Sequence, residues 1–304
     1  MRVVFRLFLF LNLLWGTCAQ AYVVHDSRGE HQLEQVPQRV VVLDWNLLEA
    51  VIELGVTPLG TADMDGYADW MVKPEIPTQT VELGNRSEPN LEKIVALKPE
   101  VILVSERHVD IIPQLERIAP VFYFSNFAAD DNDAQVAIEQ LRQLGELFQR
   151  SEIAEQKLAQ IEQRLDELKG LLQQRFAGQL PPVVLMRFAN LTSTFLYTEN
   201  SIPQYVLERL GLTNALPQPT AQWGIVQKPI ADLQHIKQGM VLYILPFNQE
   251  AQLKKSILWK AMPFVRNRHV GAVPSVWSYG GAISIQYMAE AITETLVQIA
   301  DQTS

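Results

Sequence analysis

An arginine on a predicted turn, Arg86, is the residue whose chemistry can be stated most simply. It lies in the stretch LGNRSEPNLEKIVALKPEVILVS. Pro89 suits the first position of a helix, apolar residues recur at helical spacing over 90–98, and Pro99 precedes a buried strand at 101–104. Arg86 is therefore expected at the rim of a sheet. Its planar set of donors would suit negatively charged oxygens, whereas the alternative is a solvated surface charge.

Aromatic side chains recur in both halves of the chain, in segments whose Pro and Gly residues predict loops. Such rings either cover the core or form the walls of a pocket for a partly apolar ligand, and their recurrence favours a cleft between the halves. Arg187, in VVLMRFANLT, follows the first predicted strand of the second half and could face Arg86 across that cleft. The candidate rings are Tyr67, Trp70, Trp223, Trp277 and Tyr279.

The motifs that usually carry catalysis are missing from the sequence. It contains no G-x-S-x-G elbow, no H-E-x-x-H helix, no P-loop and no glycine fingerprint after a predicted strand. The SYGGA segment at 278–282 predicts only a glycine turn. Because the histidines show no metal-ligand spacing, we expect no metal site and no enzyme, and binding is the leading class of function. The histidines are His25, His31, His108, His235 and His269.

The elements that must position these residues follow the same order in both halves, which indicates two related α/β lobes. In the first half, EAVIELGVTPLGT predicts a helix ended by Gly55 and then a short strand, and LEKIVALKPEVILVS adds a helix and a buried strand. In the second half, YVLERLGLTNALP and IADLQHIKQGMVLYILP repeat that order. We expect an N-terminal lobe at 22–143 and a C-terminal lobe at 177–304.

A long polar segment at 144–176 separates the lobes and predicts one interdomain helix. Its apolar residues recur at steps of three and four and form a single stripe. The stripe is too short for a coiled-coil dimer, so we expect a monomer in which one stiff helix packs across both lobes and limits their closure. The stripe consists of Leu158, Ile161, Leu165, Leu168 and Leu172.

The first 21 residues have the pattern of a secretory signal peptide, with Arg2 and Arg6 before an apolar run and the small residues Ala19 and Ala21 after it. Cleavage after Ala21 predicts a protein exported to the periplasm. The single cysteine, Cys18, leaves a lipoprotein open, but its neighbours suit lipid attachment poorly. The net charge of −9 argues against nucleic acid and anionic membranes as partners.

Four stretches of the sequence, taken in order, resemble the periplasmic ferric-siderophore-binding proteins of ABC importers, most closely the ferric-hydroxamate type. They are RVVVLDWNLLEAVIELGVTPLGTADMDGYADW, LGNRSEPNLEKIVALKPEVILVS, ERIAPVFYF and LWKAMPFVRNRHVGAVPSVWSYGG. The resemblance implies a class III periplasmic binding protein, with two Rossmann-like lobes joined by one long α-helix and a shallow cleft between them. It also implies a ligand that arrives as a complete iron chelate, so that the protein holds iron only through the siderophore and needs no cofactor.

The resemblance also implies roles for individual residues. Arg86 matches the arginine that bonds the iron-binding oxygens in the family. In a hydroxamate chelate these oxygens remain good acceptors while the rest of the ligand is organic, so a charged donor within broad aromatic walls suits it. The matching wall aromatics are Trp45, Trp70, Trp223, Trp277 and Tyr279.

Two positions depart from the family pattern. His108 stands where the hydroxamate-binding relatives have a pocket tyrosine, and Arg187 has no evident counterpart. An added cation would favour a more anionic chelate, such as one that contains citrate. The family delivers its ligand to an inner-membrane permease with a cytoplasmic ATPase, and candidate docking residues near predicted helix starts are Asp110, Glu116 and Asp232.

Two other functions remain open from the sequence. A haem or cobalamin carrier would share the fold, and His108 could then serve as an axial ligand of haem iron. An esterase that opens the chelate would need an activated serine, for which Ser278 is the candidate without a visible histidine partner.

Overall fold

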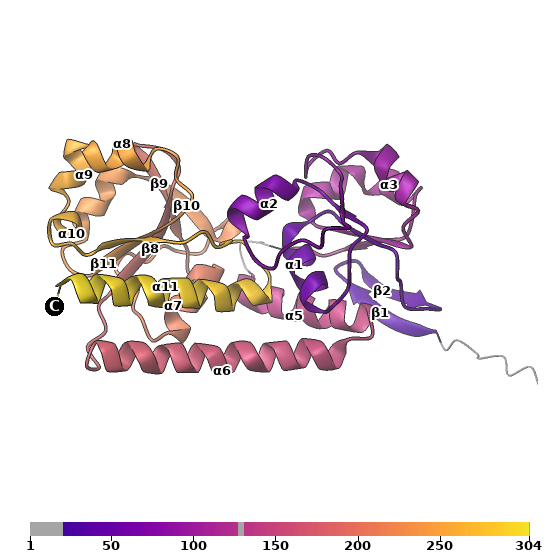
Figure 1. Ribbon diagram of the computed structural model, residues 1–304, viewed down its shortest axis with the longest axis horizontal. Coiled ribbons are helices and arrows are strands. Elements are labelled where there is room, and N and C mark those ends of the chain that lie inside the picture. Colours follow the sequence, from indigo (N-terminus) through magenta and orange to yellow (C-terminus); the bar gives the residue numbers. More distant parts are fainter. Residues whose placement is uncertain (1–20, 127–130, 304) are drawn as a thin grey trace, which may run out of the picture.

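The computed structural model describes residues 21–126 and 131–303, which form two α/β lobes side by side (Figure 1). Except for Ala21, the expected signal peptide at 1–21, including Cys18, lies outside the described residues. Across the part of the chain that is described, none of the helices has the length and apolar character needed to span a bilayer.

The N-terminal lobe is built on five parallel strands, namely β3 (Val40–Val42), β4 (Gly60–Thr61), β5 (Val81–Glu82), β6 (Val101–Val104) and β7 (Val121–Tyr123). Their order in the sheet is β5-β4-β3-β6-β7. The central strands β3 and β6 are continuous apolar runs and are fully buried, as a parallel sheet covered on both faces requires. Strands β4 and β5 lie on one side of β3, and β6 and β7 lie on its other side. The order in which the chain adds strands to the sheet therefore reverses between β3 and β6.

Six helices connect and cover these strands: α1 (Trp45–Glu53), α2 (Met64–Trp70), α3 (Leu91–Leu97), the 3₁₀ helix η1 (Glu106–Ile111), α4 (Ile112–Leu115) and α5 (Asp133–Leu147). The predicted helix is confirmed as α3, but Pro89 does not occupy its first position. Asn90 caps the helix instead, since its side chain accepts a hydrogen bond of 2.9 Å from the backbone N–H of Lys93. An antiparallel ribbon of β1 (Tyr22–Asp26) and β2 (Gly29–Leu33) is separate from the sheet.

The C-terminal lobe has a mixed sheet of β8 (Val183–Phe188), β9 (Ser193–Tyr197), β10 (Ile225–Pro229), β11 (Met240–Ile244) and β12 (Val270–Val273). Strands β8, β11 and β12 are parallel, whereas β9 runs antiparallel to β8 and β10. This antiparallel meander has no equivalent in the first sheet, so the two lobes are less alike than the sequence predicts. The remaining elements of this lobe are α7 (Ile202–Arg209), η2 (Gln222–Gly224), η3 (Ile230–His235), α8 (Glu250–Lys255), α9 (Ile257–Ala261), α10 (Pro263–Arg266) and α11 (Ala282–Thr303).

The long helix α6 (Ser151–Arg175) packs against α11, and both run along one side of the molecule (Figure 1). The predicted apolar stripe of α6 is confirmed as buried, and α6 also contacts α5 and α7. Because α11 touches α1 and α5 as well as β12, one apolar core continues through both lobes. The expected start of the interdomain helix at 144 falls within α5, and α6 begins only at Ser151. The lobe boundaries at 143 and 177 stay predictions.

Two of the aromatic residues expected in loops lie in a helix instead. Tyr67 and Trp70 belong to α2, whose N-cap is Asp63. Asp63 accepts a hydrogen bond from the backbone N–H of Gly66 at 3.2 Å, and this cap begins a helix within a segment whose Gly and Pro residues suggest a loop. Trp277 and Tyr279 do lie in an irregular segment, directly before α11.

Candidate ligand-binding site

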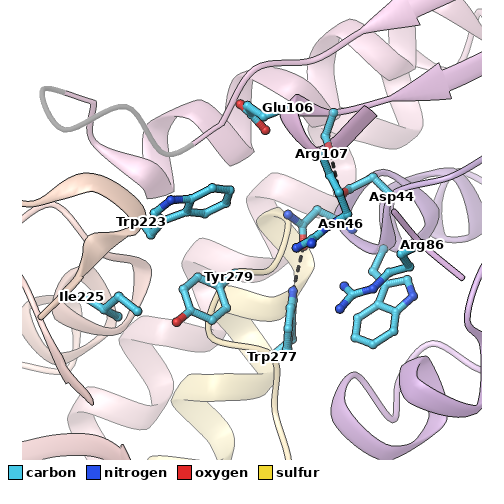
Figure 2. A pocket seen from close by; sticks show the side chains of 11 residues that line it. Asp44, Asn46, Arg86, Glu106, Arg107, Trp223, Ile225, Trp277 and Tyr279 are labelled. Carbon is cyan, nitrogen blue, oxygen red and sulfur yellow. Dashed lines mark hydrogen bonds between the residues drawn. The ribbon is translucent and has the colours of Figure 1, made fainter. Parts of the chain in front are cut away.

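A cavity of about 310 Å³ lies between the two lobes (Figure 2). Its N-terminal side is formed by residues that follow the carboxyl ends of β3, β5 and β6, where ligands usually bind in open α/β sheets. These residues are Asp44, Trp45, Asn46, Arg86, Ser105, Glu106 and Arg107. The C-terminal lobe contributes Trp223, Ile225, Trp277 and Tyr279.

Asp44 and Ser105 join the two strands between which the sheet order reverses. The Ser105 hydroxyl donates a hydrogen bond of 2.8 Å to Asp44 Oδ2. Asp44 is also the N-cap of α1, since its Oδ1 accepts from the backbone N–H of Asn46 at 2.9 Å. These bonds fix the first turn of α1, which presents Trp45 and Asn46 to the cavity.

The guanidinium of Arg86 is packed among aromatic rings on the N-terminal side of the cavity. Its Cζ lies 3.4 Å from the centroid of the Trp45 ring and 5.6 Å from that of Trp277. Burial lowers the pKa of Arg86, as does the neighbouring charge of Arg107, while Asp44 and Asp63 act in the opposite direction. The group stays cationic near neutral pH, because a guanidinium normally titrates above about 12. Arg86 thus offers a partly desolvated donor to the cavity.

His108 lies behind the cavity wall and not on its surface, which corrects its expected place as a pocket residue. The side chain is fully buried, and its Nδ1 accepts a hydrogen bond of 3.3 Å from the backbone N–H of Ser105. Its Nε2 must then carry the proton that is donated to the carbonyl oxygen of Arg86, at 2.8 Å. Burial lowers the pKa of His108 and keeps the ring neutral. His108 therefore supports the turn that carries Arg86 and has no free nitrogen for haem iron.

The tryptophans form a continuous wall that crosses from one lobe to the other. Trp45 packs edge-on against Trp277 of the other lobe at 5.2 Å between ring centroids. The indole N–H of Trp277 donates to Asn46 Oδ1 at 3.0 Å, drawn as the dashed line between these two side chains in Figure 2. Tyr67 is buried behind Trp45, at 6.0 Å between ring centroids, so it supports the wall without lining the cavity.

Arg187 and Trp70 are not among the residues that line the cavity, but they contact rings that do. Trp70 packs against Trp277 at 6.0 Å between ring centroids, and Arg187 Cζ lies 5.4 Å from the Trp70 ring. Arg187 Nη2 donates to the hydroxyl of Tyr279 at 3.4 Å. Both residues therefore hold the rings of Trp277 and Tyr279 in place, and a position of Arg187 facing Arg86 across the cleft stays a prediction.

Trp223 reaches the cavity from a strained turn. Its φ of 65° is in the left-handed region that few bulky residues adopt, and the residue is 39% exposed. Gly224 follows with a φ of 63°, and a Cβ there would lie 2.6 Å from Asp133 Oδ2. The turn is thus fitted closely against α5 of the other lobe, and it holds the indole at the cavity.

The cavity includes residues that the sequence argument did not single out, namely Asp44, Asn46, Ser105, Glu106, Arg107 and Ile225. Their place directly after predicted strands was a signal that could have identified most of them. Glu106 and Arg107, and not the expected His108, line the cavity in this segment.

Sequence and structure comparisons give the family of the chain. Residues 40–276 match the sequence model of a family described as periplasmic binding protein. The chain belongs to the periplasmic binding protein family. The iron(3+)-hydroxamate-binding protein FhuD of Escherichia coli is 30% identical over 86% of this chain and 87% of its own length. The Fe(3+) dicitrate-binding periplasmic protein FecB of the same species is 29% identical over 96% and 95%.

A solved structure extends this similarity to the fold. The siderophore-binding protein FhuD from Vibrio cholerae, with Fe3+-Desferal bound, superposes with a TM-score of 0.85. It is 55% identical and covers 86% of this chain and 98% of its own. The expected class III fold and the expectation of a binding protein are thereby confirmed.

Catalytic groups are sparse in this periplasmic binding protein. Ser278 is buried, and no histidine lines the cavity among the residues that the structure describes. Within 21–126 and 131–303, no cluster of three or more His, Cys, Asp or Glu side chains could hold a metal ion. The esterase alternative therefore gains no support from the arrangement of these side chains.

The three candidate docking acids occupy different settings. Asp110 is exposed in η1, and Asp232 is half-buried in the first turn of η3. Glu116 is exposed at the C-cap of α4 and accepts a hydrogen bond of 2.7 Å from Arg28 Nη1. Contact of these residues with a permease stays a prediction.

Proposed function

We propose that this protein captures a ferric hydroxamate siderophore in the cavity between its lobes and delivers it to an ABC permease. The observation that carries the proposal is the guanidinium of Arg86, packed over Trp45 beside a cavity walled by Trp223, Trp277 and Tyr279. A charged donor can bond the oxygens around the iron, while the rings contact the organic part of many different chelates. The similarity to the two FhuD proteins supports the same ligand class.

A citrate-containing chelate is the second candidate within this function. Arg107 lines the cavity with Arg86, and a second cation would suit a chelate with additional carboxylates. The similarity to FecB supports the same possibility. Haem is less well supported, because both nitrogens of His108 are already hydrogen-bonded.

Quenching of intrinsic tryptophan fluorescence tests the ligand class, because three tryptophans line the cavity. The purified protein is titrated with ferrichrome, ferrioxamine B, ferric citrate, ferric enterobactin, haemin and cyanocobalamin, with iron-free forms as controls. The proposal predicts saturable, equimolar quenching by the ferric hydroxamates and a much weaker response to their iron-free forms. A response confined to haemin or cyanocobalamin would keep the fold and contradict the ligand.

Delivery requires export and a surface for the permease. Removal of residues 1–21 would release the mature chain into the periplasm as a monomer, and Asp110, Glu116 and Asp232 are the proposed contacts with the permease. Charge reversal of Asp110 and Asp232 should abolish siderophore uptake by cells while the purified variants bind the chelate normally. Normal uptake by this double variant would show that Asp110 and Asp232 do not contact the permease.

A further inference from the structure

The cavity contains a carboxylate that the proposed binding of a neutral iron chelate does not use. Glu106 begins η1, directly after β6, and lines the cavity. Figure 2 places it on the opposite side of the cavity from Arg86 and on the same side as Trp223. Its Oε1 is buried and has no hydrogen-bond partner among the described residues. A buried acceptor at the edge of a cavity can take a hydrogen bond from a ligand group.

The surroundings of Glu106 are negative. The charged groups that face it are the carboxylates of Asp44, at the junction of β3 and α1, and Asp131, just before α5. No ion pair joins Glu106 to its neighbour Arg107 or to any other cation within the described ranges. Burial raises the pKa of Glu106 to about 7, and these two carboxylates raise it further. The nearby backbone of Glu106 and the side chain of Ser125 act in the opposite direction. This side of the cavity would therefore attract a cation.

We propose that Glu106 binds a primary ammonium group on the organic part of the chelate, so that the protein favours ferric hydroxamates that carry a free amine. The inference rests on the proposed function, because it places the iron-bound oxygens at Arg86 and the amine on the opposite side. The carboxylate supplies a charge-assisted hydrogen bond, the face of Trp223 attracts the same cation, and Ile225 contacts the alkyl chain that leads to it.

A matched pair of ligands tests this directly. Ferrioxamine B carries a primary amine at the end of an alkyl chain, and its N-acetylated form has the same iron centre without that charge. The measured quantity is the ratio of the two affinities within each protein variant, so that a general change in affinity cancels. The wild-type protein should prefer the free amine by roughly 5- to 20-fold, the range for a charge-assisted bond at a partly exposed site. Glu106→Gln should bring the ratio close to unity.

The control variant is Glu92→Gln, because Glu92 is exposed in the first turn of α3 and does not line the cavity. It should keep the wild-type ratio. Equal affinities for the two ligands in the wild-type protein, or an unchanged preference in Glu106→Gln, would overturn the inference while leaving the proposed function intact. If neither ligand binds the wild-type protein, the proposed function fails and this inference fails with it.

The same ratio should depend on pH. The amine stays protonated below about pH 9, whereas Glu106 gains a proton as the pH falls through about 7. The wild-type preference for the free amine should therefore be larger at pH 8 than at pH 6, and Glu106→Gln should show no such change. A wild-type preference that is constant over this range would exclude Glu106 as the group that binds the amine.

Discussion

The guanidinium of Arg86 lies over the ring of Trp45, with Cζ 3.4 Å from the ring centroid, and this contact defines the oxygen-binding end of the cavity. Trp45 is itself held by a hydrogen bond of 3.1 Å from its Nε1 to the carbonyl oxygen of Ala62. The ring therefore forms a rigid base that limits the movement of Arg86. A donor that is already positioned loses less conformational entropy when a ligand binds.

His108→Phe should destabilise the protein by about 1–3 kcal/mol, because it keeps the ring volume and leaves the Ser105 N–H and the Arg86 carbonyl without their partner. Siderophore affinity should fall only a few-fold, since the side chain does not line the cavity. Chemical denaturation and ligand titration measure the two effects. Wild-type stability combined with a large loss of affinity would instead place His108 in contact with the ligand.

Trp223→Gly and Trp223→Ala should weaken siderophore binding to a similar extent, because both remove the indole from the cavity. Their stabilities should differ, since the φ of 65° suits glycine and strains alanine. We expect the glycine variant to be about 1 kcal/mol more stable than the alanine variant in urea denaturation. Equal stabilities would show that the turn relaxes when the indole is removed.

The main elements of the fold could be predicted from local patterns. The apolar run Val101–Val104 predicted the strand β6, and the apolar stripe that begins at Leu158 predicted the buried face of α6. The β9–β10 pair could not be predicted, because its pairing depends on contacts between segments separated by the whole of α7.

The cavity was only partly predictable, and η1 shows why. The 3₁₀ turn of η1 folds His108 back beneath its N-cap Ser105, from whose backbone N–H it accepts a hydrogen bond, and leaves Ser105, Glu106 and Arg107 at the cavity. An α-helical or extended segment would have oriented the same four residues differently. The sequence identified the right segment, and the type of turn decided which side chains face the ligand.

Glu49 should make stability depend on pH. This residue of α1 is fully buried, accepts a hydrogen bond from Ser284 of α11, and has its pKa raised to about 8 by burial. Between pH 4.5 and 8 the unfolded chain loses this proton while the folded protein keeps it, so the contribution of Glu49 to stability falls as the pH rises.

Glu49→Gln removes this titration. The wild-type protein loses this stability as the pH rises, whereas the variant does not. The free energy of unfolding of the variant minus that of the wild-type protein should therefore be larger at pH 8 than at pH 5, by about 2 kcal/mol or more. Glu92→Gln serves as an exposed control and should show no such trend. A constant difference between Glu49→Gln and the wild-type protein across this range would mean that Glu49 is ionised in the folded state.

The most direct test of the account is the affinity of Arg86→Ala for a ferric hydroxamate, measured by calorimetric titration together with the melting temperature. We predict that affinity falls roughly 10- to 100-fold, because a charge-assisted hydrogen bond to the chelate is lost, while the melting temperature changes little. Arg117→Ala, which alters an exposed arginine of the same lobe, should bind as the wild-type protein does. Unchanged affinity in Arg86→Ala, or a loss of binding that follows from unfolding, would contradict the role of Arg86 as the residue that meets the iron-bound oxygens.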